Sequence, residues 1–494
     1  MEALRTVVGF VAANALLTAA GTGVLLALGV VRPRLRELFA AGGLAFLCGV
    51  SAIMVLGILG LVLGVPLRFS IYAVACLVLA VGGLLLSRWR EPLNGTPIDA
   101  VLADEPLPKP TRLSRLLGGA ALAGLAGLLA LSARYYAVLP ADAWDEFAMW
   151  SKKAVFLFHY DALDPTFFAG APYQHMHQAY PILLPVLEAF IFRAMGTANT
   201  RLIHLEFLVL LVAFLWALWF LVRRRGPLPS WAPLLLGVAA SPWIFDQLFT
   251  GYADMPLTFL LGVGVLCVGL WLEHPRPARL VLGTLLLGGA ANTKMEGLVA
   301  GAIVLALAGL LSLAWRRRRQ VAHAALALVG FAATILPWRL WIASQDVQVY
   351  LDVRRGLDPS FLWESRENAL AAAAIMGDQL ANEARLSFMV PAALALIVLC
   401  LVTGVQRRLA AFYLMAGLMQ SAFLIWVYWV EPSSWSPLRT IDTVAIFALV
   451  GFLQLATALW PDIKFTHERI VPVGAAPVRE RPTQPLLRST ATRD

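Results

Sequence analysis

The sequence predicts an all-α protein that crosses a membrane many times. Of its 494 residues, 60% are hydrophobic and only 14% are charged, whereas a soluble protein of this size carries roughly a quarter charged residues. Apolar runs of about 20 residues, the length that an α-helix needs to cross a bilayer, recur from end to end. The short alternating segments of a membrane β-barrel are missing from the sequence. We therefore expect a polytopic bundle of helices.

About thirteen apolar runs are expected to be transmembrane helices. They lie at residues 7–30, 38–64, 69–86, 116–135, 201–222, 231–246, 256–273, 279–292, 297–315, 321–342, 387–404, 409–430 and 440–460. Basic clusters stand between several of these runs, and the positive-inside rule makes such clusters cytoplasmic. The main ones are Arg32 to Arg36, Arg223–Arg225, Arg276 with Arg279, Arg316–Arg319 and Arg407 with Arg408. Counting crossings from them puts the N-terminus outside.

The charge and the cysteines exclude two classes of site. A net charge of +9 is compatible with nucleic-acid binding, but the basic residues occur as short clusters between apolar runs, which is typical of topology signals. We therefore exclude nucleic acid as a partner. The four cysteines lie far apart, each within an apolar run, and form neither a metal motif nor a disulfide framework. They are Cys48, Cys76, Cys267 and Cys400.

Composition divides the chain into four parts. Residues 1–90 are expected to form a three-helix membrane module, and residues 91–115, rich in proline and charge, a cytoplasmic linker. Residues 116–460 are expected to be the main membrane core, with a large outer loop at 136–200. The Pro- and Arg-rich residues 461–494 are predicted to be a disordered cytoplasmic tail.

The outer loop begins with three acidic residues beside a membrane-length run. Asp142, Asp145 and Glu146 stand just after the run at 116–135, and carboxylates in such a place are costly unless they face water and serve a function. Apolar residues then follow at helical spacing, which predicts a helix lying in the membrane interface. These residues are Phe147, Trp150, Ala154, Leu157 and Phe158. Tyr180–Met195 is apolar but short, and topology makes it a second juxtamembrane helix.

Other charged residues are expected at the outer ends of the helices. They include Tyr252 with Asp254, Lys294 with Glu296, and Arg439. Sugar transfer from a lipid phosphate needs a carboxylate that removes the proton of the acceptor hydroxyl. It also needs cations that hold the donor phosphate as charge develops on it. The acidic loop offers the carboxylate, and Lys294 and Arg439 offer the cations.

The order of these motifs resembles the GT-C superfamily of polyprenyl-phosphate-dependent glycosyltransferases, which includes protein O-mannosyltransferases and lipid A aminoarabinose transferases. The similar segments are Asp145-Glu146, Tyr180-Pro-Ile-Leu, Met195-Gly196 with Arg201, Tyr252-Ala-Asp254-Met-Pro-Leu, and Thr293-Lys294-Met-Glu296-Gly-Leu. Met195 replaces a phenylalanine of the family pattern. The resemblance covers roughly 116–460, so the first three helices are a departure from the family.

The resemblance implies a fold and an activity. The fold would be GT-C-like, with juxtamembrane helices in the first large outer loop. The activity would be transfer of a sugar, with inversion, from a polyprenyl-phosphate donor to a hydroxyl of a glycan, lipid or protein acceptor. The site would lie at the periplasmic or extracellular face of the inner cell membrane. The family pattern makes the first residue of the Asp-Glu pair the base, and therefore points to Asp145, with Asp142 as its rival and Glu146 beside it.

Binding roles fall to the remaining polar residues, and several of the nominated residues have a structural alternative. We expect Lys294, Arg439, Asp254, Tyr252, Glu296, Tyr180 and His177 to bind substrate. Asp142 and Asp254 are equally suited to cap helices, Lys294 to extend to the interface, and Arg439 to pair with a nearby carboxylate. No cofactor is certain. His175 and His177 suggest a divalent cation only weakly, since a pair at this spacing is common in loops.

Two other functions stay open at this point. A lipid-linked sugar transporter or flippase would have a similar number of helices and an outer charged site, but the sequence shows few charges within the runs to build a polar path. A catalytically inactive scaffold would not need the Asp-Glu pair or Lys294.

Overall fold

The computed structural model describes residues 2–90, 111–136, 143–223, 225, 228–345, 347, 354–382, 386, 389–432 and 440–468. Every regular element in these ranges is a helix. Ten of the helices are long and apolar enough to cross a membrane. They are α1 (Glu2–Ala27), α3 (Gly42–Val62), α4 (Phe69–Arg90), α5 (Arg112–Tyr136), α9 (Thr200–Val222), α12 (Asp254–Glu273), α14 (Met295–Ala314), α15 (Arg318–Ala343), α20 (Arg407–Val430) and α22 (Asp442–Glu468). The prediction of a polytopic helical membrane protein is confirmed.

The other three predicted spans are helical but shorter, so the count of thirteen stays a prediction. They correspond to α13 (Pro277–Thr293), α19 (Met389–Thr403), and the pair α10 (Leu228–Ala239) and α11 (Pro242–Leu248). The run at 231–246 is thus two helices, with Ser241 at the N-cap of the second and Pro242 opening it. Proline has no N–H to continue a helix and disfavours helical backbone in the residue before it, which explains the break.

The acidic loop folds into several short helices. They are η1 (Glu146–Trp150), α6 (Ser151–Tyr160), α7 (Pro165–Phe168), η2 (Ala171–Met176) and α8 (Leu183–Met195). Helices therefore occur at both places where the sequence predicts juxtamembrane helices. With 13 residues, α8 is about 20 Å long and too short to cross a bilayer. The remaining elements are α2 (Leu35–Ala40), η3 (Arg355–Leu357), α16 (Pro359–Glu364) and α17 (Arg366–Ala381).

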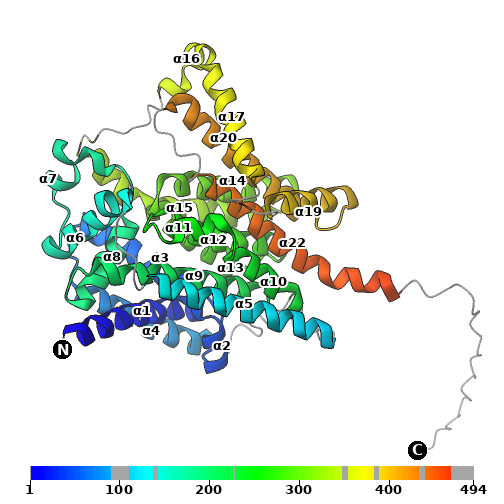
Figure 1. Ribbon diagram of the computed structural model, residues 1–494, viewed down its shortest axis with the longest axis horizontal. Coiled ribbons are helices and arrows are strands. Elements are labelled where there is room, and N and C mark those ends of the chain that lie inside the picture. Colours follow the sequence, from blue (N-terminus) through cyan, green and yellow to red (C-terminus); the bar gives the residue numbers. More distant parts are fainter. Residues whose placement is uncertain are drawn as a thin grey trace, which may run out of the picture.

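Helix α12 lies in the middle of the bundle (Figure 1). All of its membrane-length window is buried, and it contacts α9, α13, α14 and α22. A helix that is apolar on every side is the type expected at the centre of a membrane bundle. Its glycines permit close approach: a Cβ at Gly264 would meet the side chain of Leu287 on α13 at 3.0 Å.

The first three long helices pack tightly on one another and on the rest of the bundle. Helix α1 contacts α3, α4 and α8, and α3 contacts α9 and α13. Glycines allow the crossing of α1 and α3, because a Cβ at Gly21 would lie 1.7 Å from the backbone oxygen of Ala45. Asn14 of α1 also donates a hydrogen bond to Glu206 of α9 at 3.0 Å. The linker predicted at 91–115 lies outside the described residues up to 110, and the tail predicted at 461–494 lies outside them from 469 onward.

Charged residues lie at both ends of α12. Asp254 begins this helix and Glu273 ends it, about 30 Å apart along its axis. Arg225, just after α9, forms an ion pair with Glu273. A hollow of about 520 Å³ beside Glu273 is lined by Arg317, Arg407 and Arg408. Three of the basic clusters that the sequence predicts on one side, those of Arg225, Arg317 and Arg407 with Arg408, thus lie at one end of the bundle, opposite Asp254.

Candidate functional site

Eight of the ten residues that the sequence nominates for the site are described by the structure, and they lie on the η1–α8 loop and at the starts of α12 and α14. They are Asp145, Glu146, His177, Tyr180, Tyr252, Asp254, Lys294 and Glu296. Asp142 and Arg439, the other two, lie outside the described residues. Seven of the described ones belong to three contact groups, and the eighth, Tyr252, lies between Gly251 and the start of α12.

The first group is an ion-pair cluster between the starts of two core helices. The ammonium nitrogen of Lys294 lies 2.7 Å from a carboxylate oxygen of Asp254 and 3.2 Å from one of Glu296. Lys294 and Asp254 are only 4% and 2% exposed. Lys294 has extended backbone where it joins α13 to α14. Tyr428 of α20 interacts electrostatically with all three charges.

The second group centres on Glu146, which is 1% exposed. Its carboxylate contacts Nε2 of His204, a residue in the first turns of α9. Gly251 lies on its other side: a Cβ at this position would be 2.5 Å from Cδ of Glu146. Gly251 also has a φ of +66°, which favours glycine. Because Gly251 stands three residues before Asp254, it joins the acidic loop to the first group.

Asp145 lies at the edge of the second group. It is half-buried, whereas its neighbour Glu146 is buried. Asp145 occupies the N-cap position of the π-helical turn η1 and has helical backbone. A helix occurs where the sequence predicts an interfacial one, as η1 continued by α6. Single π-helical turns occur often at functional sites, because they shift side chains off the α-helical register.

The third group holds the segment around Tyr180. The ring of Tyr180 stacks on that of Trp150 at 6.0 Å and on that of His177 at 5.1 Å between centroids. His177 has a left-handed backbone with φ of +48°. Nε1 of Trp338 donates to the backbone oxygen of Ala179, 3.4 Å away. The segment is therefore held between α6 on one side and α15 on the other.

Lys153 is a functional candidate that the sequence analysis missed. It lies on α6, is fully buried, and its ammonium nitrogen donates to the backbone oxygen of His177 at 3.2 Å. The same nitrogen lies 5.6 Å from the ring centre of Trp150, a cation–π distance. Burial lowers the pKa of Lys153 to about 7. The adjacent Lys152 is not fully buried, and only the position of Lys153 at the inward face of α6 distinguishes them.

Two further carboxylates were also missed. Glu188, in the middle of α8, is 1% exposed. Burial, together with the charge of Glu146, raises the pKa of Glu188 well above its usual range. Glu206 of α9 is buried and accepts the hydrogen bond from Asn14. Each stands alone in an apolar run, so the available signal was a charge inside a helix that is otherwise hydrophobic.

The described residues offer no metal site. They contain no group of three or more His, Cys, Asp or Glu side chains placed to hold a metal ion. His175 instead lies 3.5 Å from the ammonium nitrogen of Lys152, where a cation would be repelled. The arrangement provides the half-buried carboxylate of Asp145, the buried pair of Glu146 and His204, and the buried Lys294 between two carboxylates. All of them lie at one end of the bundle.

No family model matches the chain, and no curated protein or solved structure shows significant similarity to it.

Proposed function

We propose that this protein is a membrane glycosyltransferase that moves a sugar from a polyprenyl-phosphate donor to a hydroxyl acceptor at the outer face of the cell membrane. One observation carries the proposal. The carboxylates of the η1 turn and the lysine at the start of α14 belong to one end of the bundle, joined through Gly251 and Asp254. Sugar transfer from a lipid phosphate needs both signs of charge next to the membrane.

Asp145 is the proposed base. The acceptor oxygen attacks the anomeric carbon of the sugar, the bond from that carbon to the phosphate oxygen breaks, and the phosphate leaves with the electron pair. Asp145 takes the proton of the acceptor hydroxyl. Its half-buried position supports this role over one for Glu146, which is buried against His204 and Gly251. Asp142 remains the rival base.

The two cations have different roles in this proposal. Lys294 is buried and contacts two carboxylates, so it supplies a fixed positive charge beside the donor phosphate and positions Asp254 and Glu296 there. Arg439 is the proposed phosphate ligand, because a guanidinium binds phosphate oxygens in bidentate fashion. Tyr252, Tyr180 and His177 are assigned to the sugar or the acceptor.

The test is a transfer assay on purified protein in lipid vesicles. A panel of radiolabelled polyprenyl-phosphate sugars is supplied with a membrane extract as acceptor, and wild type is compared with Asp145→Asn. Asp378→Asn is the matched control, since Asp378 is exposed on α17 and belongs to none of the three contact groups. Label that moves from one donor into product with wild type and Asp378→Asn, but not with Asp145→Asn, supports the proposal and names the sugar.

The contrary outcomes are distinct. Full transfer by Asp145→Asn removes Asp145 as the base and leaves Asp142→Asn to be measured. If no donor gives transfer and labelled lipid instead moves between the leaflets of the vesicles, the protein is a lipid-linked sugar transporter and the transferase proposal is rejected.

A further inference from the structure

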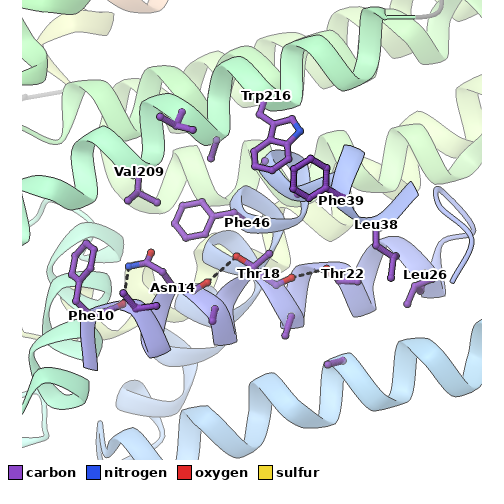
Figure 2. A pocket seen from close by; sticks show the side chains of 18 of the residues that line it. Phe10, Asn14, Thr18, Thr22, Leu26, Leu38, Phe39, Phe46, Val209 and Trp216 are labelled. Atoms are coloured by element: carbon purple, nitrogen blue, oxygen red, sulfur yellow. Dashed lines mark hydrogen bonds between the residues drawn. The ribbon is translucent and has the colours of Figure 1, made fainter. Parts of the chain in front are cut away.

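Helices α1 and α9 border a large apolar hollow (Figure 2). Its volume is about 930 Å³. One side is formed by α1, from Phe10 to Leu26, and the other by α9, from Leu208 to Trp216. Phe39 and Trp216 form an aromatic wall, with ring centres 5.0 Å apart in edge-to-face geometry.

A second hollow continues the first toward the start of both helices. It has a volume of about 550 Å³ and is lined by residues 2–7 of α1 and 199–205 of α9. On α9 the lining positions of the two hollows recur every three or four residues, which keeps them on one face of this helix. They include Leu202, Leu205, Val209, Val212 and Trp216. The two hollows are therefore successive stretches of one surface groove, which we call the α1–α9 groove.

The groove changes from polar to apolar along its length. The stretch at the helix starts is lined by Asn199, Arg201 and Tyr136 as well as Glu2. It contains the N-terminus of α9, a 23-residue helix, and both this terminus and Arg201 attract an anion. Along α1 from residue 2 to residue 26 the groove runs about 36 Å, close to the thickness of a bilayer.

The hydrogen-bond donors of the polar side chains within the apolar stretch are already used, although Oδ1 of Asn14 is buried without a hydrogen-bond partner among the described residues. The side-chain nitrogen of Asn14 donates to the backbone oxygen of Phe10 at 3.0 Å, and the hydroxyls of Thr18 and Thr22 donate one turn back at 2.8 Å each. Figure 2 shows these bonds in a row along α1. The surface that this stretch presents to an occupant is therefore mainly apolar, as a hydrocarbon chain requires.

The polar end of the groove adjoins the candidate site. Tyr136, the last residue of α5, lines the groove there. Its ring lies 6.3 Å from that of His204, and its hydroxyl interacts electrostatically with Glu146. A molecule whose polar head occupies this end reaches the acidic loop, while its chain extends along α1 into the bilayer.

We propose that the α1–α9 groove binds the single hydrocarbon chain of the polyprenyl-phosphate substrate, with the phosphate end at Arg201 and the N-terminus of α9. This inference rests on the proposed function and assigns a role to the first helices. A single groove with one polar end suits an amphiphile with one chain. A bilayer phospholipid carries two chains, and a transmembrane helix from a second copy needs no polar hollow at the end of the groove.

The test uses a polyprenyl phosphate with a photoreactive group in its terminal isoprene unit. The full-length protein, in vesicles of phosphatidylethanolamine and phosphatidylglycerol, is illuminated and the labelled peptides are mapped. We expect label within 10–26 and 208–216, and competition by unlabelled polyprenyl phosphate. Label elsewhere, or label that excess phosphatidylglycerol removes equally well, overturns the proposal. A dimer cross-linked through α1 in place of lipid labelling also overturns it and identifies a second copy as the occupant.

Groove-filling variants give an independent measurement. Ala15→Trp places a ring at an exposed position that lines the groove, and should lower labelling about tenfold, since overfilled sites exclude their occupant. Val8→Trp is the matched control, because Val8 is 57% exposed and lines neither hollow. Val212→Trp fills the groove from α9 and replaces Ala15→Trp if that variant fails to fold. Unchanged labelling in a folded groove variant contradicts the proposal.

Donor chain length separates this proposal from the proposed function. With a donor of only two isoprene units, Ala15→Trp should transfer as fast as wild type, whereas with a long-chain donor it should be about tenfold slower. If Ala15→Trp loses the same transfer rate with both donors, or loses none with either, the groove is not the site of the chain. The proposed transferase function is unaffected by that result. Absence of transfer by wild type rejects the transferase, and the labelling map still decides whether the groove binds the lipid.

Discussion

Glu146 and Gly251 touch so closely that no side chain fits between them: a Cβ on Gly251 would lie 2.5 Å from the carboxylate carbon. The loop that carries Asp145 is thereby fixed against the turn that carries Asp254. This contact joins two segments about a hundred residues apart in the chain, and it suggests the first prediction.

Gly251→Ala should be more destabilising than a glycine replacement at a similar backbone angle elsewhere. Left-handed backbone costs a non-glycine residue about 1–2 kcal/mol, and the clash with Glu146 adds to this cost. Gly64→Ala is the control, since Gly64 has a φ of +78° and nothing within 4 Å of its would-be Cβ. Thermal unfolding in detergent should show a larger fall in melting temperature for Gly251→Ala than for Gly64→Ala. Gly251→Ala should also lose transfer activity. Equal falls for the two variants would contradict the close packing.

Asp145→Asn should lower the transfer rate, whereas Glu146→Gln should lower the stability of the fold. Removal of a general base lowers the rate by about 10²–10⁴-fold, so Asp145→Asn should lose transfer at an unchanged melting temperature. Glu146→Gln should instead lower the melting temperature, because it weakens the contact with His204 in a buried setting. The assay and the melting curve are measured on the same preparations. A fall in stability for Asp145→Asn alone would reverse the two assignments.

Lys294→Met should destabilise the protein by about 3–5 kcal/mol, because it leaves two carboxylates near Lys294 without their cation in a buried place. The double variant Lys294→Met with Asp254→Asn should recover part of the loss, since one of the carboxylates is then neutral. Chemical unfolding in detergent of the wild type, the single variant and the double variant measures this coupling. A double variant less stable than Lys294→Met would count against the ion pair.

Lys153 should make stability depend on pH. Its pKa in the folded protein is about 7, below the value of about 10.4 for a lysine in an unfolded chain. Between these two values the unfolded chain binds more protons, so the contribution of Lys153 to stability rises with pH from 7 upward and is lowest below 7. The melting temperature of wild type minus that of Lys153→Met should therefore rise from pH 7 to pH 10. A difference that stays level, or falls, would mean that Lys153 is not held neutral.

The general fold follows from sequence because hydropathy alone determines which segments cross a membrane. Ten predicted spans coincide with long helices. In the acidic loop, α6 and α8 lie where apolar spacing predicts helices, whereas α7 and η2 were not predicted. Pro242 indicated the break at Ser241. The mean hydropathy of the whole apolar run does not reveal this break, because one proline hardly changes it. Short helices such as α19, with 15 residues, fall below the length at which hydropathy can decide whether a run spans.

The site was harder to predict, since its pairs are distant in sequence. His204 stands in an apolar run, and nothing near it indicates a partner 58 residues earlier. Lys294, Glu296 and Asp254 were nominated individually, but their common contact depends on how α12 and α14 pack. Which of two adjacent residues is buried, as with Asp145 and Glu146 or Lys152 and Lys153, depends on a π-helical turn that no spacing rule predicts.

Helix α12 is fastened at both ends. At the end opposite Asp254, Glu273 pairs with Arg225 and accepts a hydrogen bond from Gln454 of α22 at 2.7 Å. Tilting α12 against α9, α14 or α22 would break one of these polar links, each costly to separate where water is scarce. The central helices thus form a frame that is tied at both ends. In the proposed transferase we therefore expect the movement that admits and releases substrate at the exposed edge of α1, outside this frame.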